Sequence, residues 1–186
     1  LQTIPGINIL APSDSLELSQ FLRDAVTSNV PTYIRIGKKG EANLNLSTNQ
    51  IKLGKANFIK EGRDIIILGI GPILSEALEA SEKLKDHGLD IAIASMGSIR
   101  PFDYEFLEKL KDNNFKNWIS LEEHYSFGGL GSSIMEWIFE NKLSQRIDFK
   151  RLGVPNKFIN KLGDQKFIRN KLGIDAQGIK DFILKI

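Results

Sequence analysis

The amino-acid sequence predicts an α/β protein with a mainly parallel sheet flanked by helices, preceded by a fragment of a second α/β domain. From Arg63 onward, short apolar runs alternate with stretches that carry apolar residues at helical spacing. The first of these runs, residues 64–68, is apolar after Asp64, as expected for a strand that is buried on both faces of a parallel sheet. A polar stretch of low periodicity precedes it and separates it from a shorter strand–helix–strand pattern.

The N-terminal pattern begins with a short apolar run, residues 7–10, which we expect to be a strand. Asp14 can cap a following helix, and Glu17 three residues later completes a capping box. This helix carries one apolar stripe, formed by Leu18, Phe21, Leu22, Ala25 and Val26. Asn29 and Pro31 should end it, and residues 32–36 then predict a second strand.

The region from residue 61 predicts strands and helices in regular alternation. Strands are expected at residues 64–68, 90–94, 118–121 and 148–152. Helices are expected at residues 74–84, 104–111 and 131–141, and a closing helix places Ile179, Phe182, Ile183 and Ile186 on one face. Within the polar stretch, residues 51–58 are a candidate edge strand, so that residues 41–60 form a linker with some structure of its own.

Composition excludes several classes of function. The 186 residues carry 25 basic and 23 acidic side chains, and a net charge of +2 gives no reason to expect nucleic acid or a membrane surface as partner. There is no cysteine, which excludes disulfides and thiolate metal sites and fits a cytosolic protein. No apolar run approaches the roughly 18 residues that span a bilayer.

Glu122, Glu123 and His124 close a predicted strand, and Gly128 and Gly129 follow before the next helix. Functional loops of α/β sheets lie at the carboxyl ends of strands, and a histidine can titrate near neutrality. Adjacent carboxylates point to opposite sides of a strand, however, so they are not a matched acid–base pair. We therefore interpret this loop as an interface or as a neighbour of an active site, and predict neither a catalytic residue nor a metal site in the chain.

A basic cluster, Arg35, Lys38 and Lys39, follows the second predicted strand. It can bind a phosphate, or it can be a solvated turn before the linker. Gly69 and Gly71 make a turn that lacks the third glycine of a dinucleotide fingerprint, which favours a structural role. Residues 98–103 form a loop in which Asp103 caps the next helix, and capping alone explains it.

The order of these motifs resembles the C-terminal half of the transketolase superfamily. Residues 4–6, 11–14 and 33–38 resemble the end of its pyrimidine-binding domain. Five further segments of the sequence resemble the C-terminal domain of the same superfamily: residues 61–64, 98–103, 122–124, 128–131 and 152–155. The resemblance divides the chain into residues 1–40, the tail of the pyrimidine-binding domain, residues 41–60, a linker, and residues 61–186, a transketolase C-terminal domain.

The resemblance implies part of an enzyme that transfers a two-carbon ketol unit between sugar phosphates, using thiamine diphosphate and Mg²⁺. The family's cofactor-activating glutamate lies upstream of residue 1, and the diphosphate is held by another domain or subunit, so the chain alone should be inactive and bind no cofactor. Arg35 and Lys38 would meet the substrate phosphate, although Lys38 stands where transketolases usually have arginine. The implied partners are the missing N-terminal domains or subunit and, in a homodimer, a second copy.

Two alternatives remain open. Residues 152–155 and 172–175 are shared with 1-deoxyxylulose-5-phosphate synthase, which condenses pyruvate with a triose phosphate. The other alternative is a scaffold or interaction domain without a catalytic role.

Overall fold

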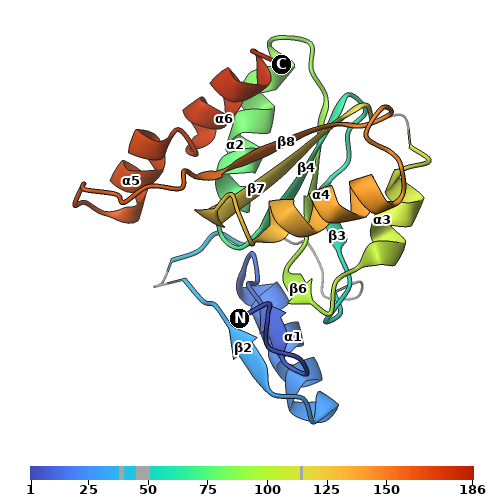
Figure 1. Cartoon of the computed structure of the whole chain (residues 1–186). Coiled ribbons are helices and arrows are strands. Elements are labelled where there is room, and N and C mark those ends of the chain that lie inside the picture. Colours follow the sequence, from blue (N-terminus) through green and yellow to red (C-terminus); the bar gives the residue numbers. More distant parts are fainter. Residues whose placement is uncertain (38–39, 45–50, 114) are drawn as a thin grey trace.

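The computed structural model describes residues 1–37, 40–44, 51–113 and 115–186. Its larger sheet has five strands in the order β3-β5-β4-β7-β8 (Figure 1). Four of them are mutually parallel, and β3 runs antiparallel along the edge of β5. This confirms the predicted mainly parallel sheet. The bounds are β3 (Asn57–Lys60), β4 (Ile65–Ile70), β5 (Ile91–Ser95), β7 (Asn117–Tyr125) and β8 (Asp148–Val154).

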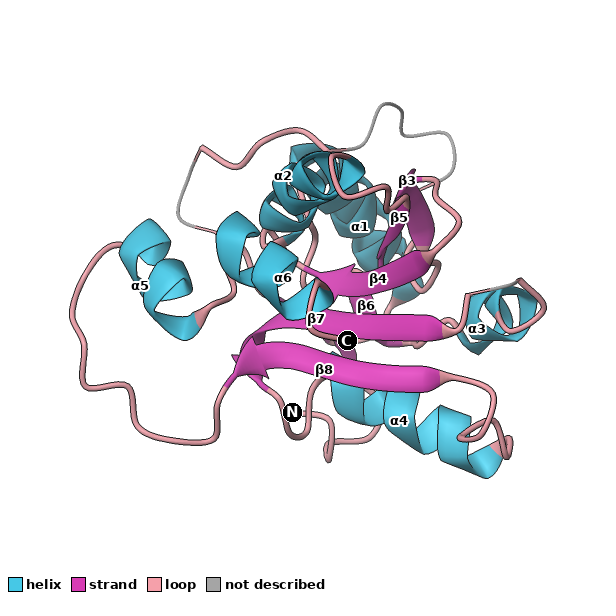
Figure 2. Ribbon diagram, turned by 90° about the horizontal axis from the view of Figure 1, so that it is seen from above, coloured by secondary structure: helices cyan, strands magenta, loops and turns pink. Residues whose placement is uncertain are grey.

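Helices cover both faces of this sheet, which explains why its central strand is apolar throughout. Ile65 and Ile67 of β4 face a core shared with α2 and α6, whereas Ile66 and Leu68 face a core shared with α3 and α4. Figure 2 shows α6 and α4 on opposite sides of β7 and β8. The bounds are α2 (Leu74–Lys85), α3 (Tyr104–Leu110), α4 (Leu130–Glu140) and α6 (Ala176–Ile183).

A smaller sheet, β2-β1-β6, joins the N-terminal segment to the rest of the chain. β1 (Asn8–Leu10) pairs in parallel with β2 (Thr32–Ile34) and in antiparallel with β6 (Ser98–Arg100). Asp103 caps α3 as predicted, accepting a hydrogen bond from Phe106 N at 3.1 Å. Capping alone does not explain this loop, however, because its residues 98–100 form β6, which also pairs with β1 of the N-terminal segment. Such short pairing leaves no periodic signal in the sequence.

The helix α1 (Ser15–Ser28) begins and ends where its capping residues predict. Asp14 accepts a hydrogen bond from Glu17 N at 2.9 Å, and Asn29 closes the helix in the left-handed conformation with φ 53°. Its apolar stripe is only partly covered: Phe21 is buried, whereas Leu22 is 46% and Val26 80% exposed. The last four residues of the expected linker, residues 57–60, form β3.

The Glu17 carboxylate fastens α1 to the larger sheet. It accepts hydrogen bonds from Ser13 N at 2.5 Å and from the Ser95 hydroxyl at 2.9 and 3.1 Å, where β5 ends. The side chain is buried. Burial raises the pKa of this carboxyl above its ordinary value of 4.5, although the hydrogen bonds from Ser13 and Ser95 oppose the rise. One charged group thus connects two segments that lie far apart in the sequence.

We expect the stability contribution of Glu17 to depend on pH. Because the folded-state pKa is raised, the contribution is complete below the unfolded-state value of about 4.5 and is lost as the pH rises through the folded-state value. Gln cannot titrate, so the difference in unfolding free energy between wild type and Glu17→Gln should shift in favour of the variant as the pH rises from the unfolded-state value of about 4.5 through the raised folded-state value. Urea denaturation across this range measures it.

Glu61→Gln is the matched control, because Glu61 is exposed on the surface. Its difference from wild type should stay within about 0.5 kcal/mol at every pH. A Glu17→Gln difference that is constant, or that shifts in favour of wild type as the pH rises, would contradict the proposed burial of the charge.

Candidate functional site

The candidate site lies where the chain changes direction across the sheet. After β4 the chain continues to β5 on one side, and β7 lies on the other side of β4. In open α/β sheets, the loops leave such neighbouring strands in opposite directions and open a crevice at their carboxyl ends. A pocket of about 230 Å³ lies there, lined by Ile70, Glu122, His124 and Leu130 and by Leu10, Tyr33 and Arg35 of the N-terminal segment.

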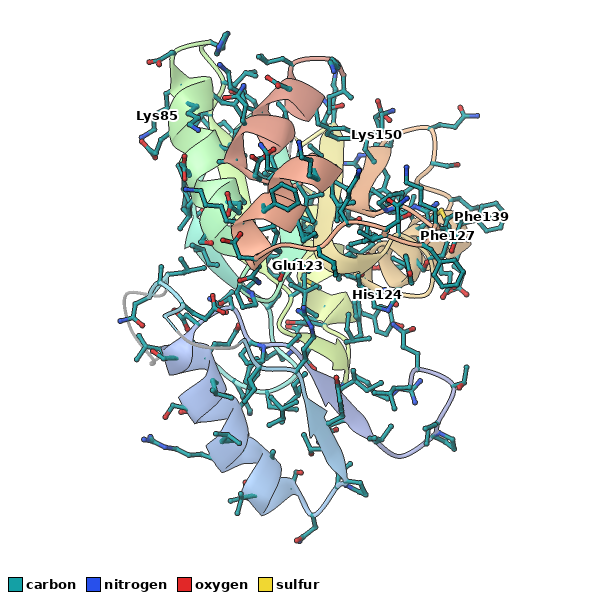
Figure 3. The ribbon with its side chains drawn as sticks, turned by 90° about the vertical axis from the view of Figure 1, so that its left-hand side faces the viewer. Lys85, Glu123, His124, Phe127, Phe139 and Lys150 are labelled. Carbon is teal, nitrogen blue, oxygen red and sulfur yellow. The ribbon has the colours of Figure 1, made fainter. Side chains whose placement is uncertain are left out.

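This pocket brings together two groups of residues that the sequence predicted separately. Arg35 comes from the end of β2, and Glu122, Glu123, His124, Gly128 and Gly129 come from the end of β7 and its loop. Figure 3 shows Glu123 and His124 where the main domain meets the N-terminal segment. Lys38, the second predicted phosphate-binding residue, lies outside the described residues.

Glu122 caps the helix α4 from the preceding strand. Its two carboxylate oxygens accept hydrogen bonds from Leu130 N at 3.0 Å and from Gly131 N at 2.9 Å. The side chain is buried, and burial raises the pKa of the carboxyl, while the two backbone hydrogen bonds oppose the rise. The N-terminus of α4, which could otherwise receive an external anion, is therefore occupied by a carboxylate of the protein itself.

Gly129 is required by this arrangement. A Cβ atom at position 129 would lie 1.9 Å from Glu122 Oε2, which is too close for any side chain. Gly128, one residue earlier, has a φ of +71° and open space around it. The glycines therefore let the loop turn sharply and pass close to a neighbour, and that neighbour is Glu122 of the same chain.

His124 is the most accessible ionisable group of the loop. Its side chain is 57% exposed, and Nδ1 lies 3.8 Å from Glu122 Oε2. Nδ1 also lies 2.8 Å from the carbonyl oxygen of Tyr125, to which it donates when it carries the proton. No general base or nucleophile is hydrogen-bonded to the imidazole among the contacts that the structure describes, which gives the ring no assigned proton-transfer role.

Glu123 points away from Glu122 into a separate polar cluster. Its Oε1 lies 2.7 Å from Arg169 Nε and 3.1 Å from Gln165 Nε2, and its Oε2 lies 3.7 Å from Arg35 Nη2. Burial by itself would raise the pKa of this carboxyl, but the hydrogen bond and charge of Arg169, with smaller contributions from Gln165 and Arg35, outweigh it and lower the pKa. Glu123 is thus an anion that is held in place by cations.

Arg169 is a site residue that sequence reasoning missed. It lies on α5 (Gln165–Leu172), is 7% exposed, and bonds through Nη1 to Glu76 at 3.2 Å. The helix itself left a signal in the sequence: Asp164 caps its start, and Gly173 ends it in the left-handed conformation with φ +68°. No sequence signal, however, names Glu123 and Glu76 as the partners of Arg169.

Arg35 is the one predicted phosphate-binding residue that can be placed. Its side chain is 45% exposed, and it extends over the turn after β4. Its Nη1 atom lies 3.6 Å from the point that a Cβ atom on Gly71 would occupy. A guanidinium in this position can form bidentate hydrogen bonds with a phosphate that enters the crevice. Within the described part of the chain, no histidine, aspartate and glutamate side chains gather in threes as they would around a metal ion.

We expect Gly129→Ala to destabilise the protein by about 2 kcal/mol or more, because the new methyl group would force the buried Glu122 carboxylate off its two N–H partners. Gly128→Ala is the matched control: it has space for the methyl group and should cost about 1 kcal/mol for its positive φ alone. Thermal and urea denaturation of the two variants compare the costs. An equal or smaller cost at position 129 would contradict the role of Gly129 in seating Glu122.

No helix among the described residues has the length and apolar character needed to cross a bilayer. Residues 54–179 match the model of the family described as transketolase, C-terminal domain. The chain is 32% identical over its whole length to 1-deoxy-D-xylulose-5-phosphate synthase of Lawsonia intracellularis, and it covers 29% of that protein. The same enzyme of Aquifex aeolicus is 30% identical over 97% of the chain, which covers 28% of it. The chain therefore spans under a third of the length of these relatives.

Solved structures agree with this family. A structure described as a split gene transketolase, inactive beta4 tetramer, superimposes on 98% of the chain with a TM-score of 0.87 and 26% identity, and the chain covers 58% of it. A transketolase mutant from Pichia stipitis superimposes on 99% of the chain with a TM-score of 0.78, and the chain covers 25% of it. At 20% identity, this second likeness shows the shared fold. The family match over residues 54–179, the relatives and the fold together show that this chain belongs to the transketolase family and carries its C-terminal domain.

Proposed function

We propose that this chain is the C-terminal part of a thiamine-diphosphate-dependent transketolase that transfers a two-carbon ketol unit between sugar phosphates. The observation that carries the proposal is the position of Arg35, which lines the crevice at the carboxyl ends of β4 and β7 together with the Glu122–His124 loop. In this proposal, residues 1–40 are the end of the pyrimidine-binding domain, residues 41–60 are the linker and residues 61–186 are the C-terminal domain.

In this proposal, the residues that the structure describes do not form a site for the diphosphate and Mg²⁺ of the cofactor. Among the described residues, no three or more histidine, aspartate and glutamate side chains gather as they would around a metal ion, and the N-terminus of α4 is taken by Glu122. We therefore assign cofactor binding to the domains or subunit that complete the enzyme, and no reaction step to the C-terminal domain. When bound there, thiamine diphosphate supplies a centre that stabilises a carbanion.

The role that we assign to the chain is to bind and orient substrate. Arg35 would hold the phosphate of the sugar through its guanidinium, and Glu122 would fix the loop beside it by capping α4. Holding the distal phosphate places the reacting carbon relative to the cofactor, so the loss of Arg35 should weaken binding of phosphorylated substrates in particular.

A second candidate function is supported by the relatives. Those at 30–32% identity carry the name 1-deoxy-D-xylulose-5-phosphate synthase, and that enzyme would use the same phosphate-binding arginine for a triose phosphate. Pyruvate would then be the donor in place of a ketose phosphate. A non-catalytic interaction domain, the third alternative, would show neither activity.

Assembly follows from the same proposal. The similar structure described as a split gene transketolase, inactive beta4 tetramer, suggests that chains of this type associate without being active. We propose that this chain pairs with a second copy and with the remainder of the enzyme. Glu122 and Gly129 are buried within their own chain, so the exposed side chains of the loop, His124 (57%), Tyr125 (41%) and Phe127 (58%), are the ones that could contact a partner.

The chain alone should bind no thiamine diphosphate and transfer no two-carbon unit. Combined with the polypeptide that completes the enzyme, it should restore turnover. A ketose phosphate donor would support transketolase, and pyruvate with a triose phosphate would support the synthase. Isothermal titration calorimetry with cofactor and Mg²⁺ tests the first point, and product analysis tests the second. Micromolar cofactor binding by the chain alone would contradict the assignment, and absence of both activities in the completed enzyme would favour the interaction domain.

In the completed enzyme, Arg35→Ala should raise the Michaelis constant for phosphorylated substrates by roughly tenfold or more, since a charge-assisted contact of 1.5–3 kcal/mol is lost. The constant for unphosphorylated analogues should change by less than about twofold, because they make no such contact. Steady-state kinetics with both substrate types measures this. Arg63→Ala, an arginine with 86% of its side chain exposed, is the control. Equal effects on both substrate types would support a solvated turn.

A further inference from the structure

Arg35 shares a carboxylate with a second arginine, and the sharing is unequal. Arg35 Nη2 lies 3.7 Å from Glu123 Oε2, beyond hydrogen-bond distance. Arg169 Nε lies 2.7 Å from Glu123 Oε1, and Gln165 adds contacts at 3.1 and 3.3 Å. Glu123 is therefore held mainly by α5, and Arg35 keeps most of its donors for other acceptors.

Arg169 is itself fixed from the other side. Its Nη1 lies 3.2 Å from Glu76 Oε1, and Glu76 Oε2 accepts a hydrogen bond from Ala176 N at 2.9 Å. The result is a row of alternating charge that runs from Arg35 through Glu123 and Arg169 to Glu76 and the N-terminus of α6. Each charge in the row is compensated by its neighbours, so the removal of one member changes the partners of the next.

There is also room for such a change. A hollow of about 290 Å³ is lined by Arg35, Glu123 and Arg169 and by aliphatic side chains of β8, α5 and their connection. Arg35 is half-exposed and therefore free to adopt another rotamer, in contrast to Arg169, whose side chain is 8% exposed. Without Arg169, the Glu123 carboxylate would be left next to a single cation, and a direct hydrogen bond to Arg35 would replace the long contact.

We propose that Arg169 is a positioning residue: it holds Glu123 on α5 and thereby keeps the Arg35 guanidinium available for the phosphate of the substrate. The inference rests on the proposed function, because it deepens the role of Arg35 given there. The proposal gives α5 a role in the site, because Arg169 and Gln165 of this helix hold the Glu123 carboxylate. A direct bond between Glu123 and Arg35 would compete with phosphate binding by Arg35. Arg169 limits this competition because it holds Glu123.

Inorganic phosphate is the probe that tests this proposal. Its affinity for the wild-type chain and for every variant is measured by isothermal titration calorimetry. In the variants that keep Arg35, the Nε–Hε signal of Arg35 in nuclear magnetic resonance shows whether the guanidinium is the group that binds. Arg169→Gln should weaken phosphate binding by roughly two- to fivefold, the scale of a partly exposed ion pair. Arg169→Lys should restore part of the loss, since it keeps the charge without the fork of donors.

The double variant Arg169→Gln with Glu123→Gln separates positioning from support of the fold. It should return the phosphate affinity to within about twofold of wild type, because the competing carboxylate is gone. A structural role of Arg169 alone predicts the opposite, a double variant at least as impaired as the single one. An affinity unchanged in Arg169→Gln, or a double variant as weak as that single variant, would overturn the proposal.

Glu123→Gln alone covers the case in which Arg169→Gln fails to fold. We expect it to bind phosphate as tightly as wild type or tighter, and weaker binding would show instead that Glu123 orients Arg35, against the proposal. Arg35→Ala decides the proposed function separately: if it leaves the phosphate affinity of the chain unchanged, the phosphate role of Arg35 fails whatever the Arg169 variants show. If Arg35→Ala abolishes phosphate binding and the double variant does not regain phosphate affinity, the positioning role of Arg169 is wrong while the phosphate role of Arg35 stands.

Discussion

The parallel pairing of β4 with β7 places the functional part of this molecule. The register sets Ile70 opposite Glu122, so the turn after β4 and the loop after β7 leave the sheet at the same level. Because β5 lies on one side of this pair and β8 lies on the other, the two loops part and leave a crevice between them. The pairing depends in turn on helices that cover both faces, since a parallel sheet of apolar strands cannot face water.

Three buried or nearly buried carboxylates support the site: Glu122 and Glu123 line the crevice, and Glu17 lies outside it. Glu17 and Glu122 accept hydrogen bonds from uncharged donors, so burial prevails and raises the pKa of both. Glu123 has two arginines beside it, and their charges lower its pKa in spite of burial. The first two carboxylates fix backbone elements, α1 to β5 and α4 to β7, whereas Glu123 is held by Arg169 and lies 3.7 Å from Arg35.

The crevice is built from two segments, of which only the second lies within the family match over residues 54–179. The N-terminal segment contributes Arg35, and β1 of that segment docks on β6 of the larger domain, with Ala11 N bonded to Gly97 O at 2.8 Å. Such an arrangement makes the position of Arg35 dependent on how well the two segments pack. The buried bond between Glu17 and Ser95 is therefore part of the support of the site, although it lies outside the crevice.

The sequence by itself determined the elements whose signal is local: the apolar strand predicted at residues 64–68 and found at residues 65–70, the caps Asp14 and Asp103, and the motif order that identified the family. It also placed Glu122 and Arg35 at the ends of strands, where α/β sheets carry their sites. Tertiary structure alone decided their partners. The bonds of Glu17 to Ser95 and of Glu123 to Arg169 join residues 78 and 46 positions apart. Periodicity and capping rules act over a few residues, so contacts of this range are set by how the helices pack on the sheet.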